Sequence, residues 1–343
     1  MERQTILRIL NVPSRLMSQK DLVHLTGHRM LIPVWHAVND KPGDHYNRLF
    51  SVPGTASFIE TLDSLLQNFK AVGLQELRAI NASGKKLSRP VMHLTFDDGL
   101  RECHEIIAPI LLKKGIPATF FINPSFIGNG DLFFRYKASL LANRMRKKQL
   151  PECMLAGVTN LLMTNEIPCS SLENGLFHIP WASRNLLDEA AQILQADFKK
   201  YLNDNQPYMT QGQVRGLISQ GFTIGSHSMD HPAYLEIGRE DQLEQTIISL
   251  ERVVMEYGLD YMAFAFPFSD MGIPRSFWDD LKTRISVPVL TFGTSGLKSD
   301  SVPGNLQRTG MELNRLNGRE IIKSEYLYCL LKMPFGKNSI KRT

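Results

Sequence analysis

Residues 91–122, VMHLTFDDGLRECHEIIAPILLKKGIPATFFI, hold two apolar runs that are separated by an amphipathic stretch and a glycine. We predict strands at Val91 to Phe96 and at Ala118 to Ile122, because both runs are short, apolar and bounded by turn residues. Glu102 to Lys114 is predicted to be a helix that ends at Gly115, since glycine readily takes the left-handed conformation of a helix end. This order of elements predicts a parallel βαβ unit.

The same alternation of strands and helices extends to both sides of this unit. Leu31 to Val38 is predicted to be the first strand, and the capping box Ser57-x-x-Glu60 is predicted to open a helix that runs to about Ala71. Further elements are predicted later in the chain, namely a helix after the capping box Thr210-x-x-Gln213, the strand Phe222 to Ser226, the helix Arg239 to Tyr257, the strand Met262 to Phe268, a helix around Ser276 to Thr283, and strands near Val287 to Phe292 and Asn305 to Thr309. The sequence therefore predicts an α/β fold with a mainly parallel sheet or barrel.

Four regions are predicted along the chain. Residues 1–29 form an N-terminal extension, residues 30–310 the α/β domain, and residues 311–343 a C-terminal helix with a basic tail. Residues 124–208 are interpreted as a mainly helical insertion in the domain, because the strand pattern is lost there between two regular stretches. The insertion follows a strand end, so we expect it to border the mouth of the fold and to influence which substrate enters.

The composition is that of an ordinary globular protein, with 43% hydrophobic residues in a chain of 343. The formal charge of +5 is small and the basic residues are scattered, which argues against nucleic-acid binding. The four cysteines lack the spacing of a zinc ribbon or of a secreted disulfide scaffold. They are interpreted as free and mostly buried thiols, at Cys103, Cys153, Cys169 and Cys329.

Two features of the sequence bear on the location of the protein. No apolar run approaches the roughly 20 residues that span a bilayer, and Arg8 interrupts the first apolar stretch, which therefore does not resemble a secretory signal. The predicted location is the cytoplasm. The segment Glu325 to Thr343 mixes apolar and basic residues, and a packed helix with a basic tail is favoured over the alternative of peripheral contact with an anionic membrane.

Polar residues that suit hydrolysis follow the predicted strands, where α/β proteins place their functional groups. Asp97 and Asp98 end one strand, and Gly99 permits a turn that lets both carboxylates reach one site, although the same triplet is also common in structural turns. His227 and His231 follow a later strand and would bind one metal if their loop makes a helical turn. The alternative for each is a hydrogen-bonded loop histidine.

Asp98 supports the interpretation that the two histidines bind a metal ion. Two imidazoles and one carboxylate form a set that leaves a coordination position open for water, as in many hydrolytic metal sites. Asp98, His227 and His231 therefore form the candidate metal site. Zinc is the cation that this set favours, while cobalt, nickel, manganese and iron are compatible with it.

The segments TFDDG at residues 95–99 and HSMDH at residues 227–231 resemble the first two motifs of the polysaccharide deacetylase family, also called NodB-homology or carbohydrate esterase family 4. The resemblance covers about Met30 to Gly310 and implies a distorted (β/α) barrel. It implies a metal site of Asp98 and the two histidines, with Asp97 as the general base. It also implies a hydrolase that removes an acyl group, acetyl first, from an amino sugar, in carbohydrate metabolism such as cell-surface polysaccharide biosynthesis.

The third motif of the family corresponds to residues 265–268, AFPF, which keep the proline and the aromatic residue but not the usual arginine. In the family that arginine orients the base. Arg308 and Arg275 are candidates to replace it, and a surface position is the alternative for each. The resemblance also implies that the substrate or its oxyanion contacts Thr95, Pro267 and Phe268.

A further departure concerns the general acid, which the family takes from a histidine near the C-terminus. No histidine follows His231 in this chain. His36 lies in a WHAV segment that resembles the first strand of longer deacetylases, and we hypothesise that it reaches the metal site as acid or as a partner of the ligands. A packed histidine at a strand end is the alternative for His36, and His93, inside a strand, is interpreted as a core histidine.

Three functions are compatible with these residues. An active deacetylase or deformylase acting on a carbon–nitrogen bond is the leading interpretation. A carbohydrate-binding protein with impaired catalysis and an O-acyl esterase are the alternatives. The expected partner is an amino-sugar glycan, or a nucleotide-linked or lipid-linked precursor made inside the cell because the chain shows no secretory signal.

Overall fold

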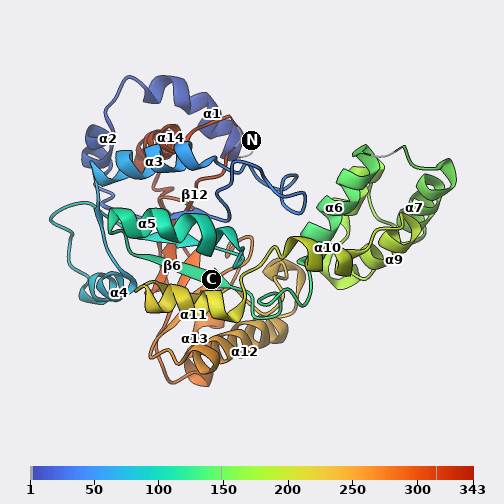
Figure 1. The fold of residues 1–343 in the computed structure, drawn as a ribbon. Coiled ribbons are helices and arrows are strands. Elements are labelled where there is room, and N and C mark those ends of the chain that lie inside the picture. The colour runs from blue at the N-terminus through green and yellow to red at the C-terminus, as the bar shows by residue number, and fades with distance from the viewer. Residues whose placement is uncertain (1–2, 148, 314) are drawn as a thin grey trace.

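The computed structural model describes residues 3–147, 149–313 and 315–343. At its centre is a parallel sheet with the strand order β11-β9-β8-β7-β6-β5-β2-β12. Its strands are β2 (Pro33–Trp35), β5 (Leu94–Phe96), β6 (Ala118–Ile122), β7 (Thr223–Ser226), β8 (Met262–Ala265), β9 (Val289–Gly293), β11 (Asn305–Gln307) and β12 (Thr309–Gly310). The sheet curls into a nearly closed barrel that is surrounded by helices (Figure 1). The predicted distorted (β/α) barrel is therefore confirmed.

The barrel closes at Arg308, because the strands at the two ends of the sheet are consecutive in the chain and only this residue separates them. Gln307 pairs with Gly293 of β9, while Thr309 pairs with Pro33 of β2. The backbone N–H of Arg308 donates to the carbonyl oxygen of Gly293 at 3.0 Å. Residues 305–310 thus bridge β9 and β2 and complete the ring of strands.

The helices around the barrel begin and end largely where local sequence signals place them. They are α3 (Thr55–Leu66), α4 (Leu74–Ser83), α5 (Ala108–Lys114), α11 (Gln211–Ser219), α12 (Arg239–Tyr257) and α13 (Arg275–Arg284), with a π-helical turn η1 (Cys103–Ile107) before α5. Thr210 and Gln213 form the predicted capping box of α11. The bounds of α12 are as predicted, and it ends at Gly258 with a φ of 64°.

The predicted capping box at Ser57 is wrong. Helix α3 begins two residues earlier, at Thr55, and its N-cap Gly54 has no side chain to cap it. Instead, the carboxylate of Asp40 accepts hydrogen bonds from the backbone N–H of Thr55 at 2.8 Å and from its hydroxyl at 2.9 Å. A residue distant in sequence therefore satisfies the orphan donors of the helix start. The helix also ends earlier than predicted, before the short strand β3 (Lys70–Ala71).

The predicted strand 91–96 is divided at His93. Its first half, β4 (Val91–Met92), pairs with β1 (Met30–Leu31) and β3, whereas β5 belongs to the barrel. The imidazole of His93 is buried and bonded on both sides, to the Val72 carbonyl at 2.9 Å and the Thr119 hydroxyl at 2.9 Å. His93 is thus a satisfied core histidine, as interpreted from the sequence.

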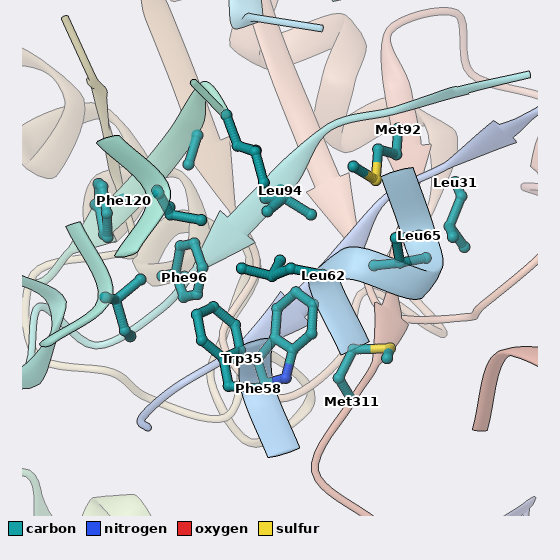
Figure 2. Packing of buried hydrophobic residues seen from close by; sticks show 14 of the residues in the cluster. Leu31, Trp35, Phe58, Leu62, Leu65, Met92, Leu94, Phe96, Phe120 and Met311 are labelled. Carbon is teal, nitrogen blue, oxygen red and sulfur yellow. The ribbon is translucent and has the colours of Figure 1, made fainter. Parts of the chain in front are cut away.

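The outer face of strands β2, β5 and β6 packs on α3 through large aromatic residues (Figure 2). Trp35 stacks on Phe96 with ring centroids 5.7 Å apart and meets Phe58 of α3 edge-on at 5.4 Å. Such pairs are each worth about 0.5–1.5 kcal/mol beyond their buried area. Since side chains alternate along a strand, a Phe96 that faces the helices leaves Thr95 and Asp97 facing the barrel interior. This packing fixes the strand ends from which His36 and Asp97 emerge.

The N-terminal extension packs on the C-terminal helix. Helices α1 (Arg3–Ser14) and α2 (Gln19–Thr26) lie beside α14 (Gly318–Lys332) on one side of the barrel (Figure 1). The Arg3 guanidinium forms a 2.7 Å ion pair with the largely buried carboxylate of Glu325 in α14. The two ends of the chain therefore form one layer over the barrel.

The insertion consists of helices that project from one side of the barrel (Figure 1). They are α6 (Phe134–Lys147), α7 (Glu152–Thr164), α8 (Leu172–His178), α9 (Leu186–Ile193) and α10 (Phe198–Asn205). Their hydrophobic core, which includes Leu141, Val158 and Leu187, is continuous with Ala37 and Tyr46 of the barrel domain. The start of α6 approaches the candidate ligands, and Arg184 of the insertion forms an ion pair with Asp230 in the histidine loop.

The C-terminal tail is bound to the domain. Strand β13 (Ser339–Ile340) pairs with β10 (Ser299–Asp300), and the Arg342 side chain, only 2% exposed, forms ion pairs with the buried carboxylates of Asp270 and Asp300.

Within the described residues, no helix is long and apolar enough to cross a membrane. The cysteines are free thiols, but only Cys103 and Cys329 are buried, since Cys153 and Cys169 are exposed.

The Arg342 ion pairs predict a strong effect on stability. Removing one partner of a buried ion pair leaves an uncompensated charge and costs about 3–5 kcal/mol. We expect Arg342→Ala to lower the free energy of unfolding by this amount, as measured by urea denaturation. The neighbouring exposed residue supplies the control, since Lys341→Ala should change it by less than about 0.5 kcal/mol. Equal effects of the two substitutions on the free energy of unfolding would contradict the interpretation that the Arg342 ion pairs stabilise the domain.

Candidate active site

The predicted site residues gather at the carboxyl ends of the barrel strands. Asp97 and Asp98 follow β5, His227 follows β7, Pro267 follows β8, and His36 follows β2. These ends lie on the same side of a parallel barrel, so loops far apart in sequence meet there. The arrangement is the one expected from the order of the strands.

Asp98, His227 and His231 converge. Each offers one ligand atom, all three atoms lie within 4.8 Å of one another, and all three residues are buried. The Asp98 Oδ1 atom is 3.3 Å from Nε2 of His231 and 3.6 Å from Nε2 of His227.

The loop that carries the histidines is not a helical turn, and this part of the prediction is wrong. Ser228 and His231 both have left-handed backbones, with φ of 65° and 60°, and the backbone N–H of His231 donates to the Ser228 hydroxyl at 3.1 Å. These two positions reverse the chain and return His231 to His227. Asp98 is also left-handed, with a φ of 70°, and this backbone geometry lets the adjacent carboxylates of Asp97 and Asp98 reach the same site.

The protonation state of His227 suits a divalent cation. His227 Nδ1 lies 2.8 Å from the carbonyl oxygen of Ala265; this partner is an acceptor, so Nδ1 carries the proton and Nε2 is left with its lone pair. Burial lowers the pKa of His227 to about 4, which keeps the ring neutral at physiological pH. Asp98 Oδ1 is buried without a hydrogen-bond partner among the described residues. A cation between these atoms would satisfy them.

Arg308 pairs with the predicted base. Its guanidinium is fully buried and donates from Nη1 to Asp97 Oδ1 at 2.6 Å, while Nε donates to the carbonyl of Gly293. Burial alone would raise the pKa of Asp97, but the positive charge of Arg308 and its hydrogen bond lower it below the usual range. Of the two arginines proposed from the sequence, Arg308 is therefore the one that contacts Asp97, from its position between β11 and β12.

Two predicted residues do not reach the site. Arg275 is exposed at the start of α13, where its backbone N–H donates to the carbonyl of Thr343, so it cannot orient Asp97. Thr95 is fully buried in the barrel, and its hydroxyl donates to the Pro33 carbonyl at 2.8 Å. The predicted substrate contact of Thr95 is therefore corrected to a role in the barrel wall.

Phe268 lies against the candidate metal site. Its ring is 46% exposed and meets His231 at a centroid distance of 4.8 Å, while Pro267 beside it is buried. The backbone of Phe268 is left-handed, with a φ of 53°. Its N–H donates to no acceptor within the described part of the chain, so it is available to a substrate oxygen.

His36 enters the mouth from β2 and pairs with a carboxylate that the sequence did not indicate. Its Nδ1 lies 2.5 Å from Oε2 of Glu312, and the backbone N–H of His36 donates to Oε1 at 2.8 Å. The ring stacks on Phe50 and remains 31% exposed. Burial opposes a positive charge there, but the charge and hydrogen bond of Glu312 raise the pKa of His36 to about 10, and the charges of Asp98 and Asp97 contribute.

Three residues at the site were missed by sequence reasoning. Glu312 lies two residues after β12, so its place after a strand end was a signal that could have found it. Tyr136 donates from its hydroxyl to Asp98 Oδ2 at 2.6 Å, and the Phe133 ring lies 4.2 Å from that of His231. Both belong to the insertion, and no local pattern marks them.

The Arg308–Asp97 pair predicts a pH-dependent loss of stability. In the intact protein the lowered pKa of Asp97 contributes stability above the ordinary carboxyl pKa, and this contribution is lost as the pH falls. In Arg308→Met the buried carboxylate loses its partner, so its pKa rises and the protein should lose about 3–5 kcal/mol at neutral pH.

The loss should shrink on acidification, as Asp97 takes up a proton, and urea denaturation at several pH values measures it. Arg275→Met, at the exposed arginine, is the matched control and should leave stability within about 0.5 kcal/mol at each pH. A deficit in Arg308→Met that does not depend on pH would contradict the assignment of Asp97 as its partner.

Comparison with known proteins agrees with this geometry. The family model named polysaccharide deacetylase matches residues 84–159, which include Asp97 and Asp98. A comparison with curated proteins finds no match. Among solved structures, the fold is similar to that of the Streptococcus pyogenes deacetylase PplD in complex with acetate, with 12% identity, a TM-score of 0.55, and coverage of 86% of this chain and 97% of that one.

IcaB from Ammonifex degensii is also similar, at 18% identity and a TM-score of 0.53, with 87% of this chain and 96% of that one covered. A polysaccharide deacetylase from Bacillus cereus follows at 13% identity and a TM-score of 0.50, covering 86% and 68%. At these identities the structures show a shared fold. Together with the family-model match over residues 84–159, they make the chain similar to polysaccharide deacetylases in its fold and in the segment that holds Asp97 and Asp98.

Proposed function

We propose that the protein is a metal-dependent hydrolase that removes an N-acetyl group, or another N-acyl group, from an amino sugar in a glycan or glycan precursor. The observation that carries this proposal is the convergence of Asp98, His227 and His231, with Asp97 beside them. The set fits a divalent cation, and zinc is the cation proposed. When bound, the cation supplies polarisation of the acyl carbonyl and lowers the pKa of water.

Asp97 is proposed as the general base. Its lowered pKa keeps it ionised at neutral pH, so it can accept a proton there. Arg308 holds Oδ1, which leaves Oδ2 directed at the metal ligands, 3.7 Å from Nε2 of His227. This orientation supports proton transfer from an attacking water to Oδ2.

The oxyanion and the acyl group are proposed to lie under Phe268. Its free backbone N–H can donate to the oxygen on which negative charge develops. The rings of Phe268 and Phe133, which both pack against His231, give the site an apolar wall. Excluding water from this side strengthens the charge interactions inside the site.

His36 is proposed as the general acid in place of the absent C-terminal histidine. Glu312 occupies Nδ1, so Nε2 is the nitrogen that can hand a proton to the leaving amine. The ring remains partly exposed at the mouth, and the charges of Asp97 and Asp98 act on it. The proton would therefore be delivered from the side of the barrel opposite the histidine loop, because β2 and β7 are separated by β5 and β6.

Acetate release tests the proposed reaction. We expect the zinc-loaded protein to release acetate from N-acetylated amino-sugar oligosaccharides, and chelation followed by zinc addition to abolish and restore the activity. Asp98→Asn should remove activity through loss of the cation. Asp97→Asn should keep the cation and lower kcat by about 10²–10⁴-fold.

The substrate panel should include O-acetylated sugars and nucleotide-linked and lipid-linked precursors. Faster release from O-acetyl than from N-acetyl sugars would favour an esterase over the proposed reaction. Zinc binding without turnover of any member of the panel would favour a carbohydrate-binding protein instead.

The His36–Glu312 pair predicts a change in the pH profile. An acid whose pKa is about 10 stays protonated through neutral pH, so kcat/KM should fall only as the pH rises through that value. Glu312→Gln removes the charge that raises the pKa of His36. The pH at which kcat/KM falls should therefore be lower by more than about one pH unit. His36→Ala should lower kcat by about 10²–10⁴-fold.

Two exposed residues provide matched controls for this pair. Glu105→Gln on the barrel surface and His178→Ala at the end of α8 should leave both the pH profile and kcat unchanged. Full activity in His36→Ala would contradict the proposal that His36 is the general acid.

A further inference from the structure

The helical insertion contacts the metal site through two aromatic residues at the start of α6. Phe133 and Tyr136 are three residues apart, so they lie on one side of the helix start. The Phe133 ring lies 4.2 Å from that of His231, and the Tyr136 hydroxyl donates to Asp98 at 2.6 Å. Two of the three candidate ligands therefore touch the insertion.

The two oxygens of Asp98 have different surroundings. Oδ1 faces Nε2 of both histidines and has no hydrogen-bond donor among the described residues. Oδ2 accepts the hydrogen bond from Tyr136. The tyrosine thus fixes the carboxylate in the rotation that directs Oδ1 toward the place of a cation. Without the hydroxyl, Oδ2 would be a buried acceptor without a partner among the described residues.

The packing around Tyr136 is tight and comes from three separate segments. Its fully buried ring meets Phe133 edge-on at 5.0 Å, His45 edge-on at 5.1 Å and Tyr208 in a stacked arrangement at 6.1 Å. Because the neighbours enclose the ring on several sides, the hydroxyl has little freedom to leave Asp98.

Helix α6 is itself fixed to the barrel. The Ser139 hydroxyl and the Asn143 side-chain amide both donate to the carbonyl oxygen of Asp44, each at 2.8 Å. Asp44 lies in the loop between β2 and α3. The helix that carries Tyr136 is therefore held from the barrel side as well as through Asp98.

We infer that the helical insertion forms part of the metal centre, and that Tyr136 is a positioning residue that sets the metal affinity by orienting Asp98. This inference rests on the proposed metal dependence and adds a role for the insertion beyond bordering the mouth. Residues that hydrogen-bond to metal ligands typically change metal affinity by 10–100-fold when they are replaced. The insertion and the cation should also stabilise one another, because such coupling is reciprocal.

Zinc affinity of the full-length protein, measured by titration against a competing chelator, tests the inference without any substrate. Tyr136→Phe keeps the ring and its packing but removes the donor, and we expect it to bind zinc about 10–100-fold more weakly. Tyr201→Phe is the matched control, since it removes a hydroxyl of the same insertion that bonds to His45 and not to a ligand. The control should bind zinc as the unaltered protein does.

Hydrogen exchange of the α6 amides provides the second readout. Zinc should slow exchange in α6 of the unaltered protein and should do so less in Tyr136→Phe. Phe133→Leu, which removes the ring against His231, is expected to weaken zinc binding too, and it provides a second variant if Tyr136→Phe unfolds. Equal zinc affinity in the unaltered protein and in the variants that fold would overturn the inference and leave the proposed function intact. Failure of the unaltered protein to bind zinc would overturn both.

Discussion

A guanidinium buried where the barrel closes neutralises the carboxylate of Asp97, which is proposed as the general base. Arg308 is the single residue between the two strands that close the sheet, and its side chain points inward to Asp97. Neither group would tolerate that position alone, because a buried unpaired charge costs several kcal/mol. Closing the barrel therefore also brings Arg308 to Asp97. Residues 265–268 contain no arginine, and the positive charge beside Asp97 comes from between β11 and β12 instead.

The remaining charges at the mouth follow from this pair. The described residues place three buried carboxylates there, Asp97, Asp98 and Glu312, against the two cationic groups of Arg308 and protonated His36. The neutral ring of His227 adds no charge to this set, in which the carboxylates are in excess by one. A divalent cation would offset the excess in a setting where water cannot. The charge balance thus favours a metal centre independently of the ligand geometry.

Local signals in the sequence were sufficient wherever a residue's neighbours in the chain decide its structure. The capping box at Thr210 and Gln213 and the bounds of α12 formed as predicted. The box at Ser57 failed because Asp40, brought near by the fold, bonds to Thr55 instead. The roles of Arg308 and Tyr136 depend on how the closing strand and the insertion lie across the barrel, which no local pattern specifies. The motifs thus placed the candidate ligands together, but not the groups that orient them.

The closure of the barrel by residues 305–310 also sets an order of events as the chain is made. Strands β2 and β9 keep an unpaired edge until residues 305–310 arrive between them. Asn305 and Gln307 in that stretch donate to Asp270 and Asp300, the same carboxylates that Arg342 holds from the end of the chain. Until this stretch is in place, the barrel is open and its edges are exposed, and such edges are prone to pairing with other chains. Insertion of residues 305–310 between β9 and β2 is the step that completes the barrel.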